Sequence, residues 1–263
     1  MEITTIDQVG NTLVFSRYPQ RIVSVVPSQT ELLADLGLGY AVVGITKFCI
    51  HPDAWFRTKS RVGGTKTLSI EKIRALQPDL LIANKEENTK EQIEALQQEF
   101  KVWISDIKDL DDALYMIREV GRILGKTNQA IDLSKTIELS FQALEGQTKT
   151  LHSAAYLIWN EPFMVAGGDT FISDMMRKAG LVNVFEKQVE RYPTTSMDEL
   201  KRLAPEFIFL SSEPFPFQEK HAEALTLELP LCRCVLVDGE LFSWYGSRLL
   251  KTAAYLPKLT KNQ

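Results

Sequence analysis

Two hydrophobic patterns alternate along the first hundred residues. Continuous apolar runs, such as RIVSVV at 21–26 and PDLLIA at 78–83, are typical of strands buried on both faces of a parallel sheet. Between them lie segments such as 88–100, in which apolar residues recur every three or four positions and predict helices. This β–α alternation predicts an open sheet with right-handed crossovers.

Polar residues at the segment boundaries predict where helices begin and end. In SQTE, Ser28 is placed to accept from the backbone of Glu31 while Glu31 reaches back, which predicts a capping box, and Gly37 is expected to end that helix. Ser69 is the expected cap of the helix over 69–77. Residues 4–15 predict a hairpin that turns at 10–11.

The middle of the chain has a different pattern. Two long helical stretches follow residue 109, and strands resume only at 154–159. We therefore expect an N-terminal lobe at 1–125 that includes the hairpin, a connecting helix at 126–150, and a C-terminal lobe at 151–263. The predicted fold class is α/β, with two doubly wound three-layer lobes joined by one long backbone helix.

An internal repeat supports two lobes. SIEKIRALQPDLLIA begins at Ser69, and the similar SMDELKRLAPEFIFL begins at Ser196, 127 residues later. A weaker pair begins at Thr30 and Thr170. A capped helix followed by proline, an acid and a strand is also a common sequence pattern in α/β proteins, so chance similarity is the alternative.

Composition and charge exclude some classes of function. The net charge of −4 with interspersed signs gives no basic stripe, so no nucleic-acid partner is expected. Cys232 and Cys234 are expected to be reduced core thiols, because side chains two apart on one strand bridge poorly. No apolar run is long enough to span a bilayer, and the first residues do not resemble an export signal. The expected location is cytoplasmic if the sequence is complete, and periplasmic or anchored outside the membrane if a leader was removed.

The loops after the predicted strands are rich in aromatic residues. Ligands of open parallel sheets bind beyond the carboxyl ends of the strands, so these loops are the candidate site. About half of their aromatic side chains are expected to pack beneath the loops, and the rest to suit a large, flat, partly apolar ligand. The aromatic residues are Phe48, Trp55, Trp159, Phe163, Phe215, Phe217, Phe242, Trp244 and Tyr245. Arg248 is expected either to pair with a carboxylate or phosphate edge of the ligand, or to cap the helix start or bind the loop backbone.

Four segments together resemble a known family: 21–38, 62–88, 161–185 and 238–248. They resemble the substrate-binding proteins of bacterial ABC importers for cobalamin, haem and ferric siderophores, most closely the cobalamin-binding branch. The resemblance implies a monomer that holds a metal chelate as cargo between its lobes and delivers it to an ABC permease. The rigid connecting helix of that family implies only small motion of the lobes. The implied ligand-binding residues are Phe48, His51, Thr65, Trp159, Phe163, Tyr192, Phe215, Phe242, Trp244, Tyr245 and Arg248.

In that family, one acidic residue on each lobe docks onto permease arginines. The matching positions here are Glu71 and Asp198, with the adjacent Glu199 as the alternative to Asp198. An acid in the first helical turn also interacts favourably with the helix dipole without any partner, which is the other interpretation. This chain has Thr65, Phe48 and Trp244 where the cobalamin-binding branch has a tryptophan, a tyrosine and an arginine, so the pocket is expected to be rebuilt.

Metal and enzyme alternatives rest on a few residues. No close His/Cys spacing predicts a metal held by the protein, and no intrinsic cofactor is expected. Cys49, His51 and Glu213 lie in candidate loops, where His51 is expected to ligate the metal of the cargo or to hydrogen-bond within its loop. The enzyme alternative is a metal-dependent hydrolase built on His51, Glu161 and His221. A cytosolic corrinoid or haem carrier that uses no permease is a third alternative, but no enzyme is expected.

Overall fold

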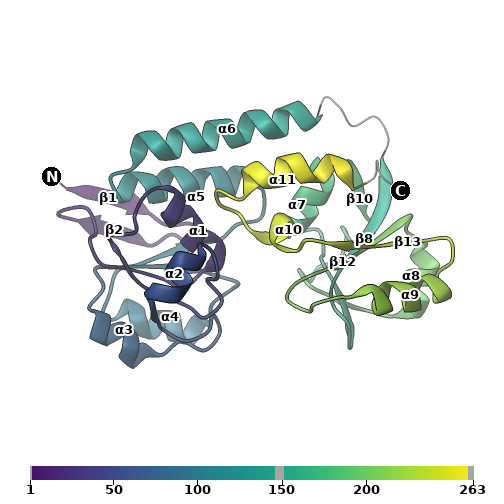
Figure 1. Cartoon of the computed structure of the whole chain (residues 1–263), viewed down its shortest axis with the longest axis horizontal. Coiled ribbons are helices and arrows are strands. Elements are labelled where there is room, and N and C mark those ends of the chain that lie inside the picture. Colours follow the sequence, from purple (N-terminus) through teal and green to yellow (C-terminus); the bar gives the residue numbers. More distant parts are fainter. Residues whose placement is uncertain (1, 146–150, 260–263) are drawn as a thin grey trace. The chain divides into compact units, whose positions relative to one another are not determined.

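The structure is a computed structural model that describes residues 2–145 and 151–259 (Figure 1). Contacts group the chain into two units. Unit 1 comprises Met1–Ile107, Asp111–Thr136 and Tyr245–Arg248, and unit 2 comprises Lys108–Leu110, Ile137–Trp244 and Leu249–Gln263. The lobes predicted at 1–125 and 151–263 differ from these units in the helical middle and in the short segment 245–248.

Unit 1 contains a five-stranded, fully parallel sheet in the order β5-β4-β3-β6-β7. Apolar residues of α3 and α4 pack on one face of the sheet, against alternate residues of β3, β6 and β7. Figure 1 shows α5 on the opposite face, so unit 1 is doubly wound as predicted. The strands are β3 Ile22–Ser24, β4 Val42–Ile45, β5 Ser60–Arg61, β6 Leu80–Asn84 and β7 Val102–Ser105. The helices are α1 Pro27–Asp35, α2 Asp53–Thr58, α3 Ile70–Leu76, α4 Lys90–Gln97 and α5 Leu110–Ile123.

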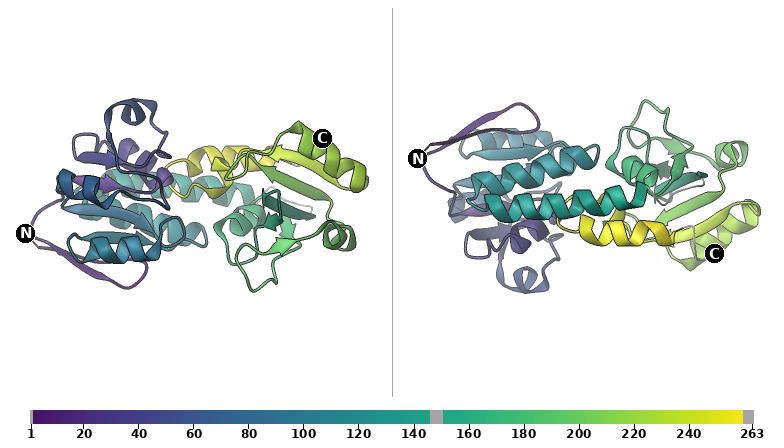
Figure 2. Two further views of the ribbon diagram at one scale, coloured as in Figure 1. Left: turned by 90° about the horizontal axis from the view of Figure 1, so that it is seen from below. Right: turned by 90° about the horizontal axis from the view of Figure 1, so that it is seen from above.

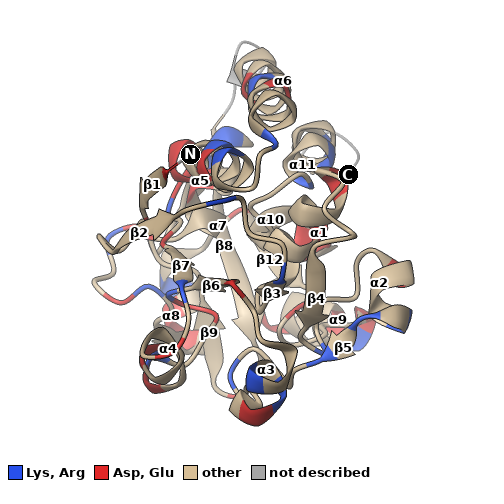
Figure 3. Ribbon diagram, turned by 90° about the vertical axis from the view of Figure 1, so that its left-hand side faces the viewer, with Lys and Arg blue, Asp and Glu red and all other residues tan. Residues whose placement is uncertain are grey.

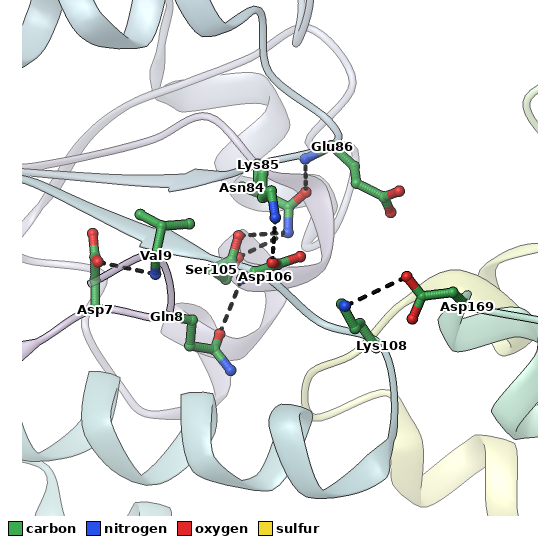
Figure 4. Close-up of polar contacts among 10 residues, drawn as sticks. All are labelled: Asp7, Gln8, Val9, Asn84, Lys85, Glu86, Ser105, Asp106, Lys108 and Asp169. Carbon is green, nitrogen blue, oxygen red and sulfur yellow. Dashed lines mark hydrogen bonds and ion pairs between the residues drawn. The ribbon is translucent and has the colours of Figure 1, made fainter. Parts of the chain in front are cut away.

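The predicted hairpin forms next to this sheet. Its strands are β1 Ile3–Ile6 and β2 Thr12–Phe15, with the turn at Gly10 as expected. The buried Asp7 carboxylate accepts from the backbone N–H groups of Val9 and Asn11 and also from that of Ile104 in β7. One side chain therefore closes the turn and joins it to the edge strand of the sheet; Figure 4 shows its bond to Val9.

Unit 2 contains a mixed sheet in the order β11-β9-β8-β12-β13, with β10 paired to β8. β8, β10, β12 and β13 are parallel, whereas β9 and β11 run antiparallel to their neighbours. The strands are β8 His152–Trp159, β9 Phe163–Val165, β10 Leu181–Asn183, β11 Thr194–Thr195, β12 Phe207–Ser211 and β13 Arg233–Val237. The helices are α7 Phe171–Lys178, α8 Met197–Leu203, α9 Glu219–Glu228, α10 Glu240–Ser243 and α11 Leu249–Tyr255, followed by the 3-10 turn Leu256–Lys258. The short strands β9, β10 and β11 are not among the elements predicted from sequence.

The helical middle consists of α5 and α6, where α6 spans Thr127–Glu145. The two helices run side by side, as Figures 1 and 2 show, and a Cβ on Gly121 would lie 2.1 Å from the Cβ of Ala130. Only glycine fits at this contact. Residues 146–150 of the predicted connecting helix lie outside the described residues. None of the described helices is long and apolar enough to cross a bilayer.

The internal repeat has the same geometry in both units. α3 and α8 have the same length, and each is followed by a strand of equal length, β6 or β12, at the 127-residue offset. Gln77 and Ala204, at equivalent positions after the helices, both adopt left-handed backbone conformations, with φ of 45° and 43°. Two non-glycine residues in this rare conformation at the same point make chance similarity a poor explanation of the repeat.

The predicted capping box at Ser28 is wrong. α1 begins at Pro27, its N-cap is Val26, and Ser28 lies inside the first turn. Proline fits the first helical position because its missing N–H would have no partner there. Ser69 is the N-cap of α3 without a side-chain bond, whereas Ser196 caps α8 by accepting from the N–H of Glu199 at 3.2 Å.

Candidate functional site

The carboxyl edge of the sheet in unit 1 is built from buried polar side chains. β6 and β7 end in Asn84 and Ser105, which are 3% and 0% exposed. The Asn84 side chain donates to Ser105 Oγ at 2.9 Å (Figure 4). Gln29 from α1 donates to the same oxygen at 2.5 Å. A connected buried network of this kind fixes the strand ends from which the loops depart.

Asn88 extends this network to a loop that carries a predicted site residue. Its Oδ1 accepts from the N–H of Asn84 at 2.8 Å, and its Nδ2 donates to the carbonyls of Val25 at 3.2 Å and Thr65 at 3.0 Å. Asn88 is 4% exposed, while Thr65 is half-buried. One amide therefore joins three loops at the carboxyl edge.

The rest of the Thr65 loop is held by the start of α4. Gln92 accepts from the N–H of Leu68 at 3.1 Å and donates to its carbonyl at 3.2 Å, as a neighbouring strand would. Thr89 donates to the carbonyl of Lys66 at 2.9 Å. Gly63, with φ of +106°, makes the turn into the loop, where a Cβ would lie 2.3 Å from the Thr67 carbonyl. The loop is thus shaped by its own backbone and by three polar side chains.

The other predicted residues of unit 1 differ in exposure. Phe48 is 50% exposed, and the Nζ of Lys47 lies 5.0 Å from its ring centroid. His51 is half-buried. Cys49 between them is fully buried and contacts the hydroxyl groups of Thr30 and Thr46, each at 3.1 Å. Burial raises the pKa of this thiol, which favours the protonated form and a packing role.

The segment Tyr245–Arg248 belongs to unit 1 and is fixed there at both ends. Arg248 donates from Nε and Nη2 to the two oxygens of Glu31, each at 2.8 Å, and both side chains are buried. Tyr245 donates its hydroxyl to Glu87, and burial followed by the nearby Glu87 charge raises its pKa well above the ordinary value. Arg248, predicted to pair with a ligand edge, to cap the helix start or to bind the loop backbone, pairs with a carboxylate of α1, a partner that the sequence analysis did not name. No local pattern marks this pairing, because 217 positions separate Arg248 from Glu31.

Unit 2 places an aromatic cluster at the carboxyl edge of its sheet. Trp159 at the end of β8 is 40% exposed, and its ring meets that of Phe215 edge-on at 5.7 Å. Phe215 in turn contacts Phe217 at 4.8 Å and His221 at 5.3 Å. Phe163, half-buried, packs on the core below. We call Trp159, Phe163, Phe215, Phe217 and His221 the aromatic shelf.

Glu213 lies between the shelf and the loop after β13. It accepts from Ser243 Oγ at 2.7 Å and from Trp244 Nε1 at 3.0 Å. Burial raises the pKa of this carboxyl, with the nearby Glu240 and Asp238 charges acting in the same direction. Burial favours the protonated form of this carboxyl group, whereas the two hydrogen bonds that it accepts favour the carboxylate and fix the orientation of the Trp244 indole.

Phe242 is a core residue of unit 2. It is fully buried, with its ring centroid 4.8 Å from that of Tyr156 and 6.2 Å from that of Phe209. It therefore has no surface to offer a ligand in this structure and does not belong to the candidate site. Four of the nine loop aromatic residues are buried, namely Phe217, Phe242, Trp244 and Tyr245, close to the expected half.

Tyr192 lies in the segment that packs along β9. The N–H of Val165 donates to the carbonyl of Pro193 at 3.0 Å, and that of Gly167 to the carbonyl of Arg191 at 2.8 Å. Tyr192 is half-buried. A Cβ on Gly167 would lie 2.5 Å from the Glu190 carbonyl, so only glycine permits this close backbone packing.

The residues suggested for a hydrolase are divided between the units. His51 lies in unit 1, while Glu161 and His221 lie in unit 2. His221 uses Nδ1 to accept from the N–H of Gln218 at 2.9 Å, which caps α9. In the described part of the chain, no three histidine, cysteine, aspartate or glutamate residues are grouped so that they could hold a metal ion.

Glu71 and Asp198 occupy the same position in the repeated unit. Each lies in the first turn of its helix, and each is exposed. The alternative residue Glu199 is half-buried and accepts from Thr195 at 3.0 Å. Asp198 is therefore the residue that presents its carboxylate at the surface of α8.

A pocket of about 360 Å³ lies beside the polar network of unit 1. The hairpin turn, the end of β6 and the exposed side of α4 line it, including Asn11, Lys85 and Gln97. None of the predicted ligand-binding residues lines this pocket. The sequence reasoning also missed Asn84, Asn88 and Gln92, although the polar run that follows the apolar strand 80–83 marks the position of the first two.

The sequence is similar to a known protein family and to several of its members. The model of the family described as periplasmic binding protein matches residues 22–226. The Vitamin B12-binding protein of Vibrio vulnificus (strain CMCP6) is 25% identical over 195 residues, which are 73% of this chain and 71% of the relative. That of Pectobacterium carotovorum subsp. carotovorum (strain PC1) is 25% identical over 242 residues, or 89% of this chain and 86% of the relative.

Solved structures share the fold at lower identity. The periplasmic vitamin B12-binding protein of Vibrio cholerae matches with a TM-score of 0.78 and 21% identity, covering 93% of this chain and 99% of that one. The periplasmic heme-binding protein of Roseiflexus sp. RS-1 has a TM-score of 0.74 and 21% identity, with coverage of 90% and 97%. An Fe3+-hydroxamate transport protein of Saccharomonospora viridis DSM 43017 has a TM-score of 0.77 and 18% identity, with coverage of 97% and 98%.

Proposed function

The chain belongs to the periplasmic binding protein family, and we propose that it is the substrate-binding component of an ABC importer whose cargo is a metal chelate. Vitamin B12, heme and Fe3+-hydroxamate are named for its relatives and structural neighbours, and each is a metal complex with a large organic frame. The family consists of binding proteins, so the chelate is cargo and not a catalytic cofactor.

The aromatic shelf is the observation that carries the proposal. Trp159 is 40% exposed at a strand end, where its ring is held at a fixed angle by Phe215. Aromatic faces bind a flat, partly apolar ligand by dispersion and stacking, and rings held by neighbouring rings lose little entropy on binding. In unit 1, the half-exposed Phe48 and the fastened loop of Thr65 offer a second contact surface. His51, Tyr192 and the small exposed parts of Trp244 and Tyr245 complete the proposed ligand-binding set. Arg248 positions the segment of Tyr245 through its ion pair with Glu31.

A titration tests this proposal. The purified chain is titrated with cyanocobalamin, cobinamide, haemin and a ferric trihydroxamate while tryptophan fluorescence and visible absorbance are recorded. We expect saturable one-to-one binding of at least one chelate, weakened about tenfold or more by Trp159→Ala, since base-like stacking on an aromatic ring contributes roughly 1–3 kcal/mol. Tyr40→Ala, which removes a 66% exposed ring that precedes β4 and is not part of the proposed ligand-binding set, is the control. Absence of saturable binding by every chelate would contradict the proposal.

We further propose that Glu71 and Asp198 dock the protein onto arginines of the ABC permease. Both carboxylates are exposed in the first turns of equivalent helices, and α3 also carries basic residues (Figure 3). Exposed charges of this kind steer association and fix register between partners. The repeat then has a functional reason, because it places one equivalent acid on each unit. We place the working protein as a monomer on the outer side of the cytoplasmic membrane, consistent with the periplasmic location typical of the family.

A further inference from the structure

Three strand-end loops of unit 2 contain no basic residue. The loops are 160–162 after β8, 212–218 after β12 and 238–244 after β13, and they contain four carboxyl groups without lysine, arginine or histidine. The four are Glu161, Glu213, Asp238 and Glu240. Glu161 and Asp238 are exposed. Glu213 shares its loop with Phe215 and Phe217, and the loop of Glu161 joins Trp159 to Phe163. The loop of Asp238 and Glu240 contains Trp244, which donates to Glu213 beside the aromatic shelf.

The corresponding loops of unit 1 do not compensate for this charge. The loops after β4, β5, β6 and β7 carry four lysines and four acids: Lys47, Lys66, Lys85, Lys108, Glu86, Glu87, Asp106 and Asp109. The Nζ of Lys85 pairs with Asp106 at 2.6 Å, and that of Lys66 donates to the carbonyl of Glu86. The lysines and acids of these loops therefore balance, whereas the three loops of unit 2 named above carry carboxyl groups alone.

The arginine best suited to an anionic cargo is already bound. Arg248 is the one arginine among the predicted ligand-binding residues. Its Nε and Nη2 atoms each donate to an oxygen of Glu31 at 2.8 Å. The side chain is 8% exposed. The Glu31 carboxylate balances the charge of this buried guanidinium and occupies its Nε and Nη2 donors. Arg248 is therefore not available to bind a carboxylate of the cargo with two parallel hydrogen bonds.

We infer that the site selects chelates that are neutral or positively charged and rejects those with several negative charges. This inference rests on the proposed function and narrows its cargo class. An anionic edge placed beside Glu161 and Asp238 would meet like charges in a partly dehydrated setting, where repulsion is stronger than in water. A neutral corrinoid or ferric trihydroxamate, or a cationic cobinamide, avoids this repulsion. Haem with two propionates and a ferric tricatecholate with three negative charges do not.

Paired probes test the charge selection. The full-length chain is titrated at low and high salt with a neutral ferric trihydroxamate and a trianionic ferric tricatecholate, and with a cationic cobinamide and haemin. We expect the neutral or cationic member of each pair to bind more tightly, by about tenfold or more at low salt. Added salt should reduce this ratio, because it screens repulsion of the anion and attraction of the cation.

Charge-neutralising variants localise the effect. Glu161→Gln and Asp238→Asn should each strengthen binding of the anionic probes and weaken that of the cationic probe, by about two- to fivefold. Glu223→Gln, the same charge change at an exposed position in the middle of α9, is the matched control and should change neither. Anionic chelates that bind as tightly as neutral ones, or variants that behave like the control, would overturn the charge selection while leaving the binding function intact. Failure of every probe to bind would overturn both.

Discussion

Arg248 and Glu31 form a two-armed ion pair inside unit 1, with both N···O distances at 2.8 Å and side chains 8% and 11% exposed. The pair joins the segment Tyr245–Arg248 to α1. Gly246 lies against the carbonyl of Ser28 within this contact, where a Cβ would approach to 2.8 Å. The ion pair of Arg248 thus attaches residues 245–248 to unit 1, and Gly246 allows the backbone of this segment to pack closely against α1.

Removal of one partner of this pair should destabilise the protein strongly. Arg248→Met leaves the Glu31 carboxylate buried without its partner, so we expect a loss of about 3–5 kcal/mol in the free energy of unfolding. Glu31→Met should do the same. The double variant should recover much of the loss, since two apolar side chains of similar volume leave no buried charge. Urea unfolding of the four proteins measures the cycle, and additive losses would show that the pair does not act as a unit.

The Asn88 side chain should be required for order in the Thr65 loop. Asn88→Ala removes three hydrogen bonds from a site that is 4% exposed, and we expect a loss of roughly 2–3 kcal/mol because the freed backbone groups remain buried. Amide hydrogen exchange should rise in residues 63–68 and not in β13. Thr136→Ala, an exposed helical position, is the control. Unchanged exchange in residues 63–68 would mean that Gln92 and Thr89 suffice to hold the loop.

The fold is predictable from sequence where its signals are local. Buried strands such as 80–84 and the helix after Ser69 follow from apolar periodicity and end residues, and the repeat by itself predicts two similar lobes. The strands β9, β10 and β11 have only two or three residues each, too few for a periodic signal. Their strand conformation depends on pairing with β8 or with each other, which is a tertiary effect.

The candidate site is predictable only in part, for a related reason. Aromatic residues after strands mark the shelf correctly, because strand ends and loop composition are local features. Phe242 and Arg248 lie in the same kind of loop, yet one packs in the core and the other binds Glu31. The sequence pattern does not reveal the rings that contact Phe242 or the carboxylate that binds Arg248, because these partners are far away in the sequence.

Charge reversal at the docking residues should separate transport from binding. In Glu71→Arg with Asp198→Arg, both changes lie on exposed first turns, so we expect chelate affinity within about twofold of the parent and loss of permease-coupled transport. Vesicle uptake with the cognate permease and ATPase is the measurement. Lys72→Glu with Lys201→Glu, which changes charge on the same two helices, is the control for a general charge effect. Full transport by the double arginine variant would exclude the docking role.

The two left-handed helix ends offer a stability gain. Ala204 has φ of 43° at the end of α8, where glycine avoids the contact between Cβ and the backbone. We expect Ala204→Gly to raise the free energy of unfolding by about 0.5–1 kcal/mol, and Gln77→Gly to act in the same direction. Ala179→Gly, at the end of α7 with φ of −81°, should destabilise instead, because glycine there adds only unfolded-state entropy. A loss of stability in Ala204→Gly would show that its methyl group contributes more than the strain costs.

The buried carboxyl of Glu213 should give folding stability a specific pH dependence. Burial raises its pKa in the folded protein above the ordinary value of 4.5, so the folded chain keeps this proton to a higher pH than the unfolded chain does. Its contribution to stability is therefore present below the ordinary value and is lost as the pH rises through the folded pKa. Glu213→Gln keeps an oxygen that accepts from Ser243 and Trp244 but does not titrate. The difference in free energy of unfolding between this variant and the parent should therefore change in favour of the variant as the pH rises, and then level off.

Glu206, whose pKa is lowered by its hydrogen bond from His152, gives the opposite control, because Glu206→Gln should lose stability relative to the parent as the pH rises. Urea unfolding of the three proteins between about pH 3 and about pH 8 measures both differences, because the change at Glu206 lies below its ordinary pKa of 4.5. Parallel curves for Glu213→Gln and the parent would mean that Glu213 is charged in the folded state at no cost.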